Sequence, residues 1–277
     1  PRRRGRGGGT AAGPSRRRAL DRARKRAQGR GLWRRLLGTM TPAFCLPGPA
    51  PLAFLFNTER LGLAGAAVVV AIVVASLGIH EAAHAWMAWK RGDSTAKDLG
   101  RMTLNPIAHI DPVMTILLPT ISILTMGFLF GGAKPVPVNP RRFRRPHFDN
   151  ALVALAGPVS NMLLAVFFFA LFHLLVERLQ LYDMSQVLPN VLYSAALANV
   201  ILAAFNLVPI PPLDGSRVVT WLLPSHLRGP YNLLEPFGLI ILLLLFYQVP
   251  AFSHYLQKSM AELALFLNRI ATLFGLW

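Results

Sequence analysis

The amino-acid sequence predicts an all-α polytopic membrane protein, with about four to six transmembrane or re-entrant helices and short extended segments in the loops. Of its 277 residues, 53% are hydrophobic and only 15% are charged, a balance typical of proteins embedded in a bilayer. Long apolar stretches recur along the chain, and residues 61–79 carry no charge over a length that can cross a hydrocarbon core of about 30 Å. The single cysteine, Cys45, excludes an intrachain disulfide and a cysteine-based metal cluster.

The net charge of +17 is concentrated near the N-terminus. Residues 1–35 hold fourteen Lys or Arg and one Asp, whereas the remainder holds fifteen basic and eleven acidic residues. Residues 1–40 are therefore expected to form a basic, disordered tail that can contact anionic lipid headgroups. No aromatic residue interleaves with these charges before Trp33, so no specific nucleic-acid partner is expected. The printed chain begins with Pro, which makes Met40 a candidate initiator.

Two regions follow this tail, a membrane-embedded core at residues 41–230 and C-terminal membrane or interfacial helices at residues 231–277. Apolar runs alternate with polar or proline-rich ones, and this alternation predicts the individual elements. Residues 42–56 are apolar but rich in proline, which favours a short broken span or an interfacial segment. Residues 61–89 form the first long helix, and the polar stretch 90–111 should hold turns or short strands. Further apolar segments are expected at 113–130, 151–176 and 184–213, then a turn region at 215–230, an apolar segment at 236–246 and an amphipathic interfacial helix at 252–277.

Three ionisable residues lie at the end of the first long helix, where His80, Glu81 and His84 form the pattern H-E-x-x-H. Residues four apart share a face of a helix, so both imidazoles can bind one metal ion, with Glu81 beside it as a general base. Such groups are costly in lipid and indicate a functional site. The alternative is an interfacial helix end whose histidines only reach toward the headgroups. His109 and Asp111 are weaker candidate ligands, because a loop histidine is more often solvated or hydrogen-bonded.

A second polar group closes the apolar segment 184–213. The run from Asn206 to Gly215 reads N-L-V-P-I-P-P-L-D-G, and its prolines end the helix. Unwound backbone at membrane depth is tolerated only where it lines a protein cavity. A carboxylate is a standard third partner of two histidines at zinc, so Asp214 is expected to complete the site, although a surface turn would show the same local pattern. Asn206 and Asn161 are candidates for polarising or holding substrate, and a helix–helix contact is an equal alternative for Asn161.

Together the two motifs resemble the site-2 protease family of intramembrane zinc metalloproteases, in its compact branch without PDZ or CBS domains. This resemblance implies one Zn²⁺ per chain on His80, His84 and Asp214, with Glu81 as the base and a membrane-protein helix as substrate. It covers about residues 60–230 and also includes G-D-S-T-A at 92–96, G-R-M-T-L-N-P at 100–106, A-K-P-V-P-V-N-P at 133–140 and A-G-P-V-S-N at 156–161.

The predicted function is a zinc-dependent endopeptidase that hydrolyses peptide bonds in or near transmembrane helices, as in regulated intramembrane proteolysis. A metal-ion transporter is the main alternative, because intramembrane His, Glu and Asp also mark ion pathways. Glu81 favours the protease, since transport requires no base next to the metal. A catalytically inactive scaffold is disfavoured by the complete set of four residues. The sequence indicates neither the substrate nor the oligomeric state.

Charge in the loops predicts the orientation of this multi-pass protein in its membrane, the plasma or inner membrane if the source is bacterial. The basic loops 90–111 and 134–150 both favour the cytoplasm. A re-entrant segment at 113–130 would keep both loops, and both motifs, on the same side of the bilayer. The active site is then expected toward the cytoplasm. In relatives, an extended strand such as the run 135–140 can hold substrate by β-addition.

Overall fold

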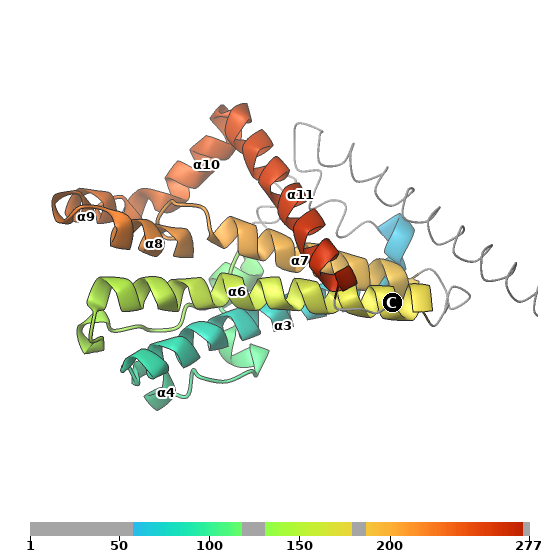
Figure 1. The fold of residues 1–277 in the computed structure, drawn as a ribbon, viewed down its shortest axis with the longest axis horizontal. Helices are drawn as coiled ribbons and strands as arrows, with labels where there is room; N and C mark the ends of the chain where they lie inside the picture. Colours follow the sequence, from blue (N-terminus) through green and yellow to red (C-terminus); the bar gives the residue numbers. More distant parts are fainter. Residues whose placement is uncertain (1–57, 118–130, 179–186, 274–277) are drawn as a thin grey trace, which may run out of the picture. The chain divides into compact units, whose positions relative to one another are not determined.

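The computed structural model describes residues 58–117, 131–178 and 187–273. The chain divides into two units, Pro1–Pro42 and Ala43–Trp277, and all described residues belong to the second. The predictions for the tail at 1–40 and for residues 42–56 and 118–130 therefore lie outside the described residues. The helices, shown in Figure 1, are α3 (Thr58–Arg91), α4 (Thr95–Asp98), η1 (Pro106–His109), η2 (Pro112–Leu117), η3 (Pro140–Arg142), α6 (Pro146–Phe172), η4 (His173–Arg178), α7 (Val187–Asn206), α8 (Asp214–Leu222), α9 (Ser225–Asn232), η5 (Glu235–Phe237), α10 (Gly238–Gln248) and α11 (Pro250–Leu273).

Among the described residues, four helical stretches are long and apolar enough to cross a membrane. No β-strand occurs among the residues that the structure describes. Both findings confirm the predicted all-α polytopic membrane fold, because a helix satisfies all its backbone hydrogen bonds within one segment. The four stretches are Leu61–Arg91, Pro146–Leu175, Val187–Asn206 and Ser225–Leu245.

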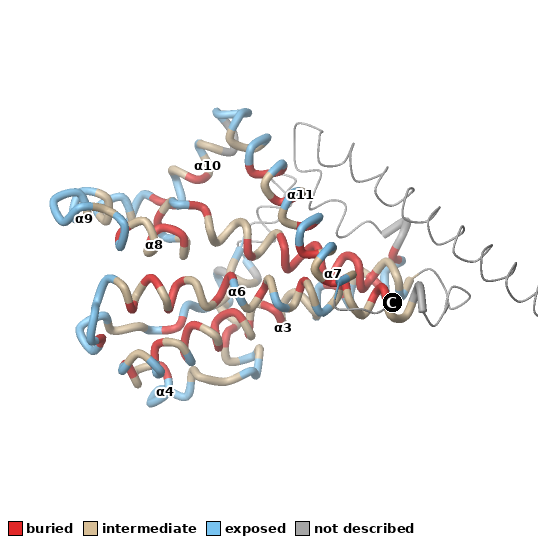
Figure 2. Tube along the Cα trace, in the orientation of Figure 1, coloured by how far each residue is buried: buried red, intermediate tan, exposed pale blue. Residues whose placement is uncertain are grey.

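Helices α3, α6 and α7 pack against one another and form the core that carries the polar motifs. Helix α7 is the most deeply buried of the three, with every residue from 191 to 200 buried (Figure 2). Small residues such as Ala195, Ala196 and Ala198 let the neighbouring helices approach closely. In this setting a polar side chain on α7 points into protein rather than into lipid.

Helix α6 begins five residues before the predicted segment 151–176. Pro146 occupies its first turn, where a missing backbone N–H costs nothing. The buried carboxylate of Asp149 accepts a hydrogen bond from the backbone N–H of Arg145 at 2.8 Å, and from the guanidinium of Arg91 at 2.5 Å. This ion pair links the end of α3 to the start of α6. The predicted segment began too late because the first turn of α6 is polar and lies outside the apolar run.

The prediction of a turn region at 215–230 is wrong, because helices α8 and α9 occupy it. Pro224 precedes α9 as its N-cap, where a proline costs little, and Asp214 places a carboxylate in the first turn of α8. The loop 90–111 holds the short helices α4 and η1 and no strand, so the strand alternative is also wrong there.

Helix α11 presents one apolar face to α6 and α7. Leu256, Met260, Ala264 and Leu267 are buried at spacings of three and four residues, the period of one helical face. The amphipathic helix predicted at 252–277 is thus observed at Pro250–Leu273. Its interfacial location stays a prediction.

Candidate metal centre

Three ligand-type side chains from two distant parts of the chain converge in the core. His80 and His84 lie one turn apart on α3, and Asp214 lies in the first turn of α8, just after the proline-rich break that follows α7. Asp214 Oδ2 is 3.2 Å from His80 Nε2 and 3.3 Å from His84 Nε2. The two Nε2 atoms are 3.0 Å apart. The structure therefore brings together all three predicted metal ligands.

The opposite ring nitrogens each face an oxygen atom, so in the neutral tautomer that donates from Nδ1 all three converging atoms are acceptors. His84 Nδ1 lies 2.7 Å from the backbone carbonyl of Val153, and His80 Nδ1 lies 2.6 Å from Asn161 Oδ1. When Nδ1 donates, Nε2 of a neutral imidazole carries a lone pair. Asp214 Oδ2 is buried and has no hydrogen-bond partner. Three converging lone pairs repel one another unless a metal cation, or a proton on one imidazole, lies between them.

The spacing of the three atoms fits zinc. Zinc binds histidine nitrogen and carboxylate oxygen at about 2.0–2.1 Å, and a tetrahedron with such bonds has edges of about 3.3–3.4 Å. The observed triangle, with sides of 3.0, 3.2 and 3.3 Å, approximates one face of that tetrahedron. Its fourth corner is then left for a water molecule or a substrate atom.

Glu81 lies beside the ligands and is held by a backbone amide. Ligand atoms of His80, Glu81 and His84 all lie within 4.8 Å of one another. Glu81 Oε2 accepts a hydrogen bond from the backbone N–H of Val136 at 2.9 Å. Glu81 and Val136 are both buried. A carboxylate in this position can exchange a proton with a group bound beside the two imidazoles.

Two glycines allow the helices to meet at the site. A Cβ on Gly157 of α6 would lie 2.5 Å from His80 Cε1 and from both Cε1 and Nε2 of His84. Likewise, a Cβ on Gly215 would collide with the backbone carbonyl of Leu207. Only glycine therefore fits behind the imidazoles and directly after Asp214.

The two predicted asparagines differ in their surroundings. Asn161 is fully buried, and its oxygen faces His80 Nδ1 while its Nδ2 donates to Asn199 Oδ1 at 3.0 Å. Asn161 thus contacts His80, a predicted metal ligand, and also joins α6 to α7. Asn206 instead donates its side-chain N–H to the carbonyl of Leu202 in its own helix, at 2.9 Å. Its contact with substrate stays a prediction.

The weaker candidates His109 and Asp111 make local contacts. Nε2 of the buried His109 lies 3.0 Å from the carbonyl of Thr103. Asp111 accepts the backbone N–H of Val113 at 2.9 Å, an arrangement typical of a helix start. Neither belongs to the cluster of His80, Glu81 and His84 among the described residues.

Sequence reasoning missed four contributors to the site: Ser76, Val153, Gly157 and Asn199. Ser76 and Asn199 could have been noticed as polar residues inside apolar spans, where a polar side chain needs an internal partner. Gly157 lies in the A-G-P-V-S-N run, but neither its close approach to the imidazoles nor the carbonyl of Val153 could be predicted locally, because each depends on how α6 packs against α3.

Asp93 anchors the segment that reaches Glu81. It accepts hydrogen bonds from the backbone N–H of Asn139 at 2.6 Å and from the N–H and hydroxyl of Thr95 at 3.0 and 2.5 Å. Burial raises the pKa of Asp93, but these hydrogen bonds and nearby Arg142 outweigh burial and lower the pKa below its ordinary value of 3.8. An ionised Asp93 thus fixes residue 139, three positions after the Val136 amide.

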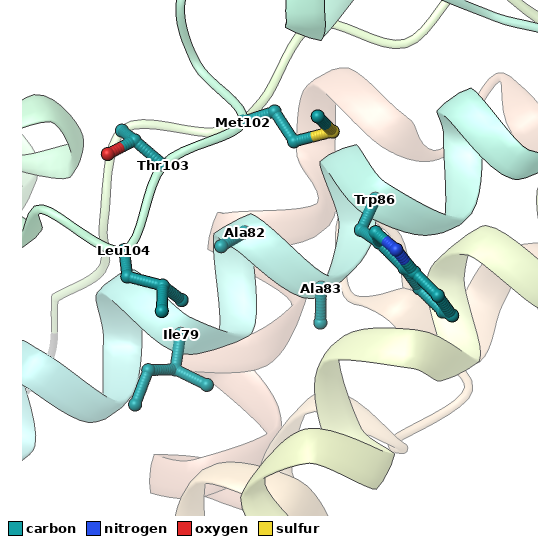
Figure 3. Close-up of a pocket in the computed structure, with 7 residues that line it drawn as sticks. All are labelled: Ile79, Ala82, Ala83, Trp86, Met102, Thr103 and Leu104. Atoms are coloured by element: carbon teal, nitrogen blue, oxygen red, sulfur yellow. The ribbon is translucent and has the colours of Figure 1, made fainter.

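An apolar groove of about 380 Å³ runs along α3 close to this region (Figure 3). Helical periodicity places its α3 residues on a different face from His80 and His84. The groove is therefore separate from the metal ligands. Its lining residues are Ile79, Ala82, Ala83, Trp86, Met102, Thr103 and Leu104.

Comparisons with known proteins agree with this chemistry. A model of the family described as "Peptidase family M50" matches residues 179–245, the region that contains Asp214. "Putative zinc metalloprotease YwhC" of Bacillus subtilis is 43% identical over 64% of this chain and 79% of its own length. Two proteins with the name "Putative zinc metalloprotease Rip2" also match. That of Mycobacterium tuberculosis is 33% identical over 70% of this chain and 73% of its own length. The protein of Mycolicibacterium smegmatis is 32% identical over 53% of this chain and 54% of its own length.

No solved structure matches this chain significantly. The identity to YwhC over most of that protein's length, and the matching family model, confirm both the resemblance and the predicted class of enzyme. The chain belongs to peptidase family M50, the site-2 protease family, and is a membrane-embedded zinc metalloprotease.

Proposed function

We propose that this protein is an intramembrane endopeptidase that cleaves peptide bonds in or near transmembrane helices of other membrane proteins, as in regulated intramembrane proteolysis. One zinc ion per chain would be held by His80, His84 and Asp214. The observation that carries the proposal is the convergence of two imidazole nitrogens and one carboxylate oxygen, 3.0–3.3 Å apart, at the end of a helix long and apolar enough to span a membrane.

Glu81 is the general base and then the general acid of the proposed reaction. When bound, zinc supplies the Lewis acid that makes water reactive near neutral pH. The Glu81 carboxylate takes a proton from the attacking water while the new C–O bond forms at the peptide carbonyl. It then gives this proton to the leaving amine nitrogen as the C–N bond breaks. The Val136 N–H keeps one carboxylate oxygen of Glu81 in place during both transfers.

Residues 134–139 are the proposed border of the substrate site, because their backbone reaches Glu81. The amides of Lys134, Val136 and Asn139 already donate to His109, Glu81 and Asp93. Pro135 and Pro137 have no N–H to offer. A substrate strand added here would therefore donate its own N–H groups to carbonyl groups of this segment. It would receive few hydrogen bonds from the segment in return, so only one of the two directions of a β-ladder is available.

Charge supports a site that faces the cytoplasm. Lys90 and Arg91 form the last turn of α3, just beyond His84. The Lys90 ammonium lies over the rings of Trp86 and Trp89, at 5.5 and 5.4 Å from their centroids. Lysine and tryptophan side by side at a helix end are typical of a membrane interface, and basic residues favour its cytoplasmic side. The arginines at 141–145 directly precede α6. They lie at the same end of the helix pair as Lys90 and Arg91, because Arg91 is paired with Asp149 in the first turn of α6.

Replacing Glu81 with Gln tests the proposal. This change keeps the shape of the side chain and removes the base, so we expect cleavage to fall by about 10²- to 10⁴-fold while zinc content stays at the wild-type value. The measurement is cleavage of a membrane-helix reporter in proteoliposomes, beside elemental analysis of the same preparation. Wild-type cleavage by Glu81→Gln would contradict the mechanism. A wild type that cleaves no reporter but moves zinc across the liposome would establish the transporter instead.

A further inference from the structure

A chain of buried hydrogen bonds leads from the metal centre through three helices. It runs from His80 on α3 to Asn161 on α6, then to Asn199 on α7, and returns to Ser76 on α3. We propose that Asn199 is a positioning residue, which acts through Asn161 to fix the tautomer and the orientation of His80. The inference rests on the proposed function only in taking His80 as a zinc ligand.

The direction of every bond in this chain follows from one backbone carbonyl. Asn199 lies 2.9 Å from the oxygen of Ala195, which can only accept a hydrogen bond. The atom of Asn199 on that side must therefore be its nitrogen, and the second hydrogen on this nitrogen reaches Ser76 Oγ at 3.1 Å. Both N–H groups of the Asn199 amide are then used, and its oxygen faces Asn161.

The same logic carries the direction onward to the imidazole. Because Asn199 presents an oxygen at 3.0 Å, Asn161 must present its nitrogen there and turn its own oxygen toward His80. This oxygen accepts from His80 Nδ1 at 2.6 Å, so the proton of the neutral ring is on Nδ1. Nε2 is left with the lone pair that faces His84 and Asp214.

The two histidines thus reach the same tautomer by different routes. The carbonyl of Val153 sets His84 directly, and a carbonyl has only one polarity. His80 faces a carboxamide, which can turn over and offer N–H instead of oxygen. If Asn161 turned over, His80 would accept at Nδ1 and carry its proton on Nε2, in the position that the metal must occupy. Asn199 prevents this, because a turned Asn161 would place its oxygen against the oxygen of Asn199. No water could relieve that contact, since Asn161, Asn199 and Ser76 are only 0, 0 and 2% exposed.

The zinc affinity of full-length protein in detergent micelles, measured by competition with a chelator, tests this role without any cleavage assay. We expect Asn199→Ala to weaken zinc binding by about 10- to 100-fold, the usual effect of removing an outer partner of a histidine ligand. Asn199→Asp keeps the acceptor for Asn161 and should bind zinc more tightly than Asn199→Ala, even where its melting temperature is lower. Ser76→Ala should have a smaller effect, since the carbonyl of Ala195 still orients Asn199.

The matched control is Asn268→Ala, which removes a second, partly buried hydrogen bond between histidine and asparagine, that of His173 and Asn268 at 3.0 Å. We expect this variant to lose stability and keep its zinc affinity. In metal-free protein with ¹⁵N-labelled histidine, the signal of His80 should report Nδ1–H in the wild type and a mixture of tautomers in Asn199→Ala. The inference is overturned if Asn199→Ala binds zinc as the wild type does, or if Asn199→Asp binds it no better than Asn199→Ala. A wild type that binds zinc but cleaves nothing would defeat the proposed function and leave this inference standing.

Discussion

Two histidine–asparagine pairs lie against helix α6, and only one of them belongs to the metal centre. In the first pair α6 supplies Asn161 to His80 of α3, at 2.6 Å. In the second pair the histidine is His173, the residue directly after α6, and its partner at 3.0 Å is Asn268 of α11. Both histidines are buried, with 4 and 5% exposure. Burial and a carboxamide partner are therefore common to both.

The difference lies in what the other ring nitrogen faces. His80 Nε2 meets His84 Nε2 and Asp214 Oδ2 within 3.2 Å. His173 belongs to no group of three or more ligand-type residues in the described part of the chain. A histidine in a membrane helix is thus explained by one interhelical hydrogen bond. A metal site needs several acceptors that converge, each turned by a partner behind it.

Removing a converging ligand should produce the largest difference between the two pairs. His84→Ala or Asp214→Ala should weaken zinc binding by more than about 100-fold, because loss of an outer partner alone costs about 10- to 100-fold. His173→Ala should retain about one zinc per chain. Elemental analysis after dialysis against a chelator measures all three. Full zinc in both ligand variants, or loss of zinc in His173→Ala, would break the comparison.

A second, smaller effect is expected at the glycine behind the imidazoles. The Cβ of Gly157→Ala would lie 2.5 Å from atoms of His80 and His84. The imidazoles are side-chain ends that can rotate away if their Nδ1 hydrogen bonds to Asn161 and Val153 break, so the fold should survive while both Nε2 atoms leave their positions. We expect zinc affinity to fall at least about tenfold, as for other disturbances of ligand orientation.

Gly229→Ala is the matched control, since a Cβ there meets nothing within 4 Å. Alanine is a better helix former than glycine by about 1 kcal/mol, but a Cβ before Pro230 disfavours helical backbone, so we expect little net change in stability and an unchanged zinc affinity. Equal zinc affinities in Gly157→Ala and Gly229→Ala would show that the imidazoles do not need the space at residue 157.

The convergence of the three proposed ligands could be predicted from the sequence because their chemistry is local. His80 and His84 are one helical turn apart, and Asp214 follows a proline-rich helix end, so each motif can be recognised without knowing the fold. The all-helical membrane class followed equally directly from apolar runs such as 61–79. The start of α6 was harder to predict, because Arg145 and Asp149 form a polar cap that lies outside its apolar run.

The groups behind the ligands could not be predicted in the same way. Asn199 looks like any polar residue in a span until α7 is packed against α6, and Val153 contributes only its backbone. The second pair shows a similar limit, since His173 lies in no metal-binding motif and yet nothing in the local sequence indicates that Asn268 is its partner. Which carboxamide faces which imidazole is decided by helix packing alone.

The smallest expected effect concerns the second pair itself. Asn268→Ala removes a hydrogen bond between α11 and the end of α6 without touching the metal centre. Such bonds in membrane proteins contribute about 0.6 kcal/mol on average and up to about 1.7 kcal/mol, so the free energy of unfolding should fall within that range. Reversible unfolding in mixed micelles measures the change, and chelator competition on the same sample measures zinc affinity. If zinc affinity fell as far as in Asn199→Ala, helix α6 would transmit the loss from His173 to Asn161, and the two pairs would form one unit.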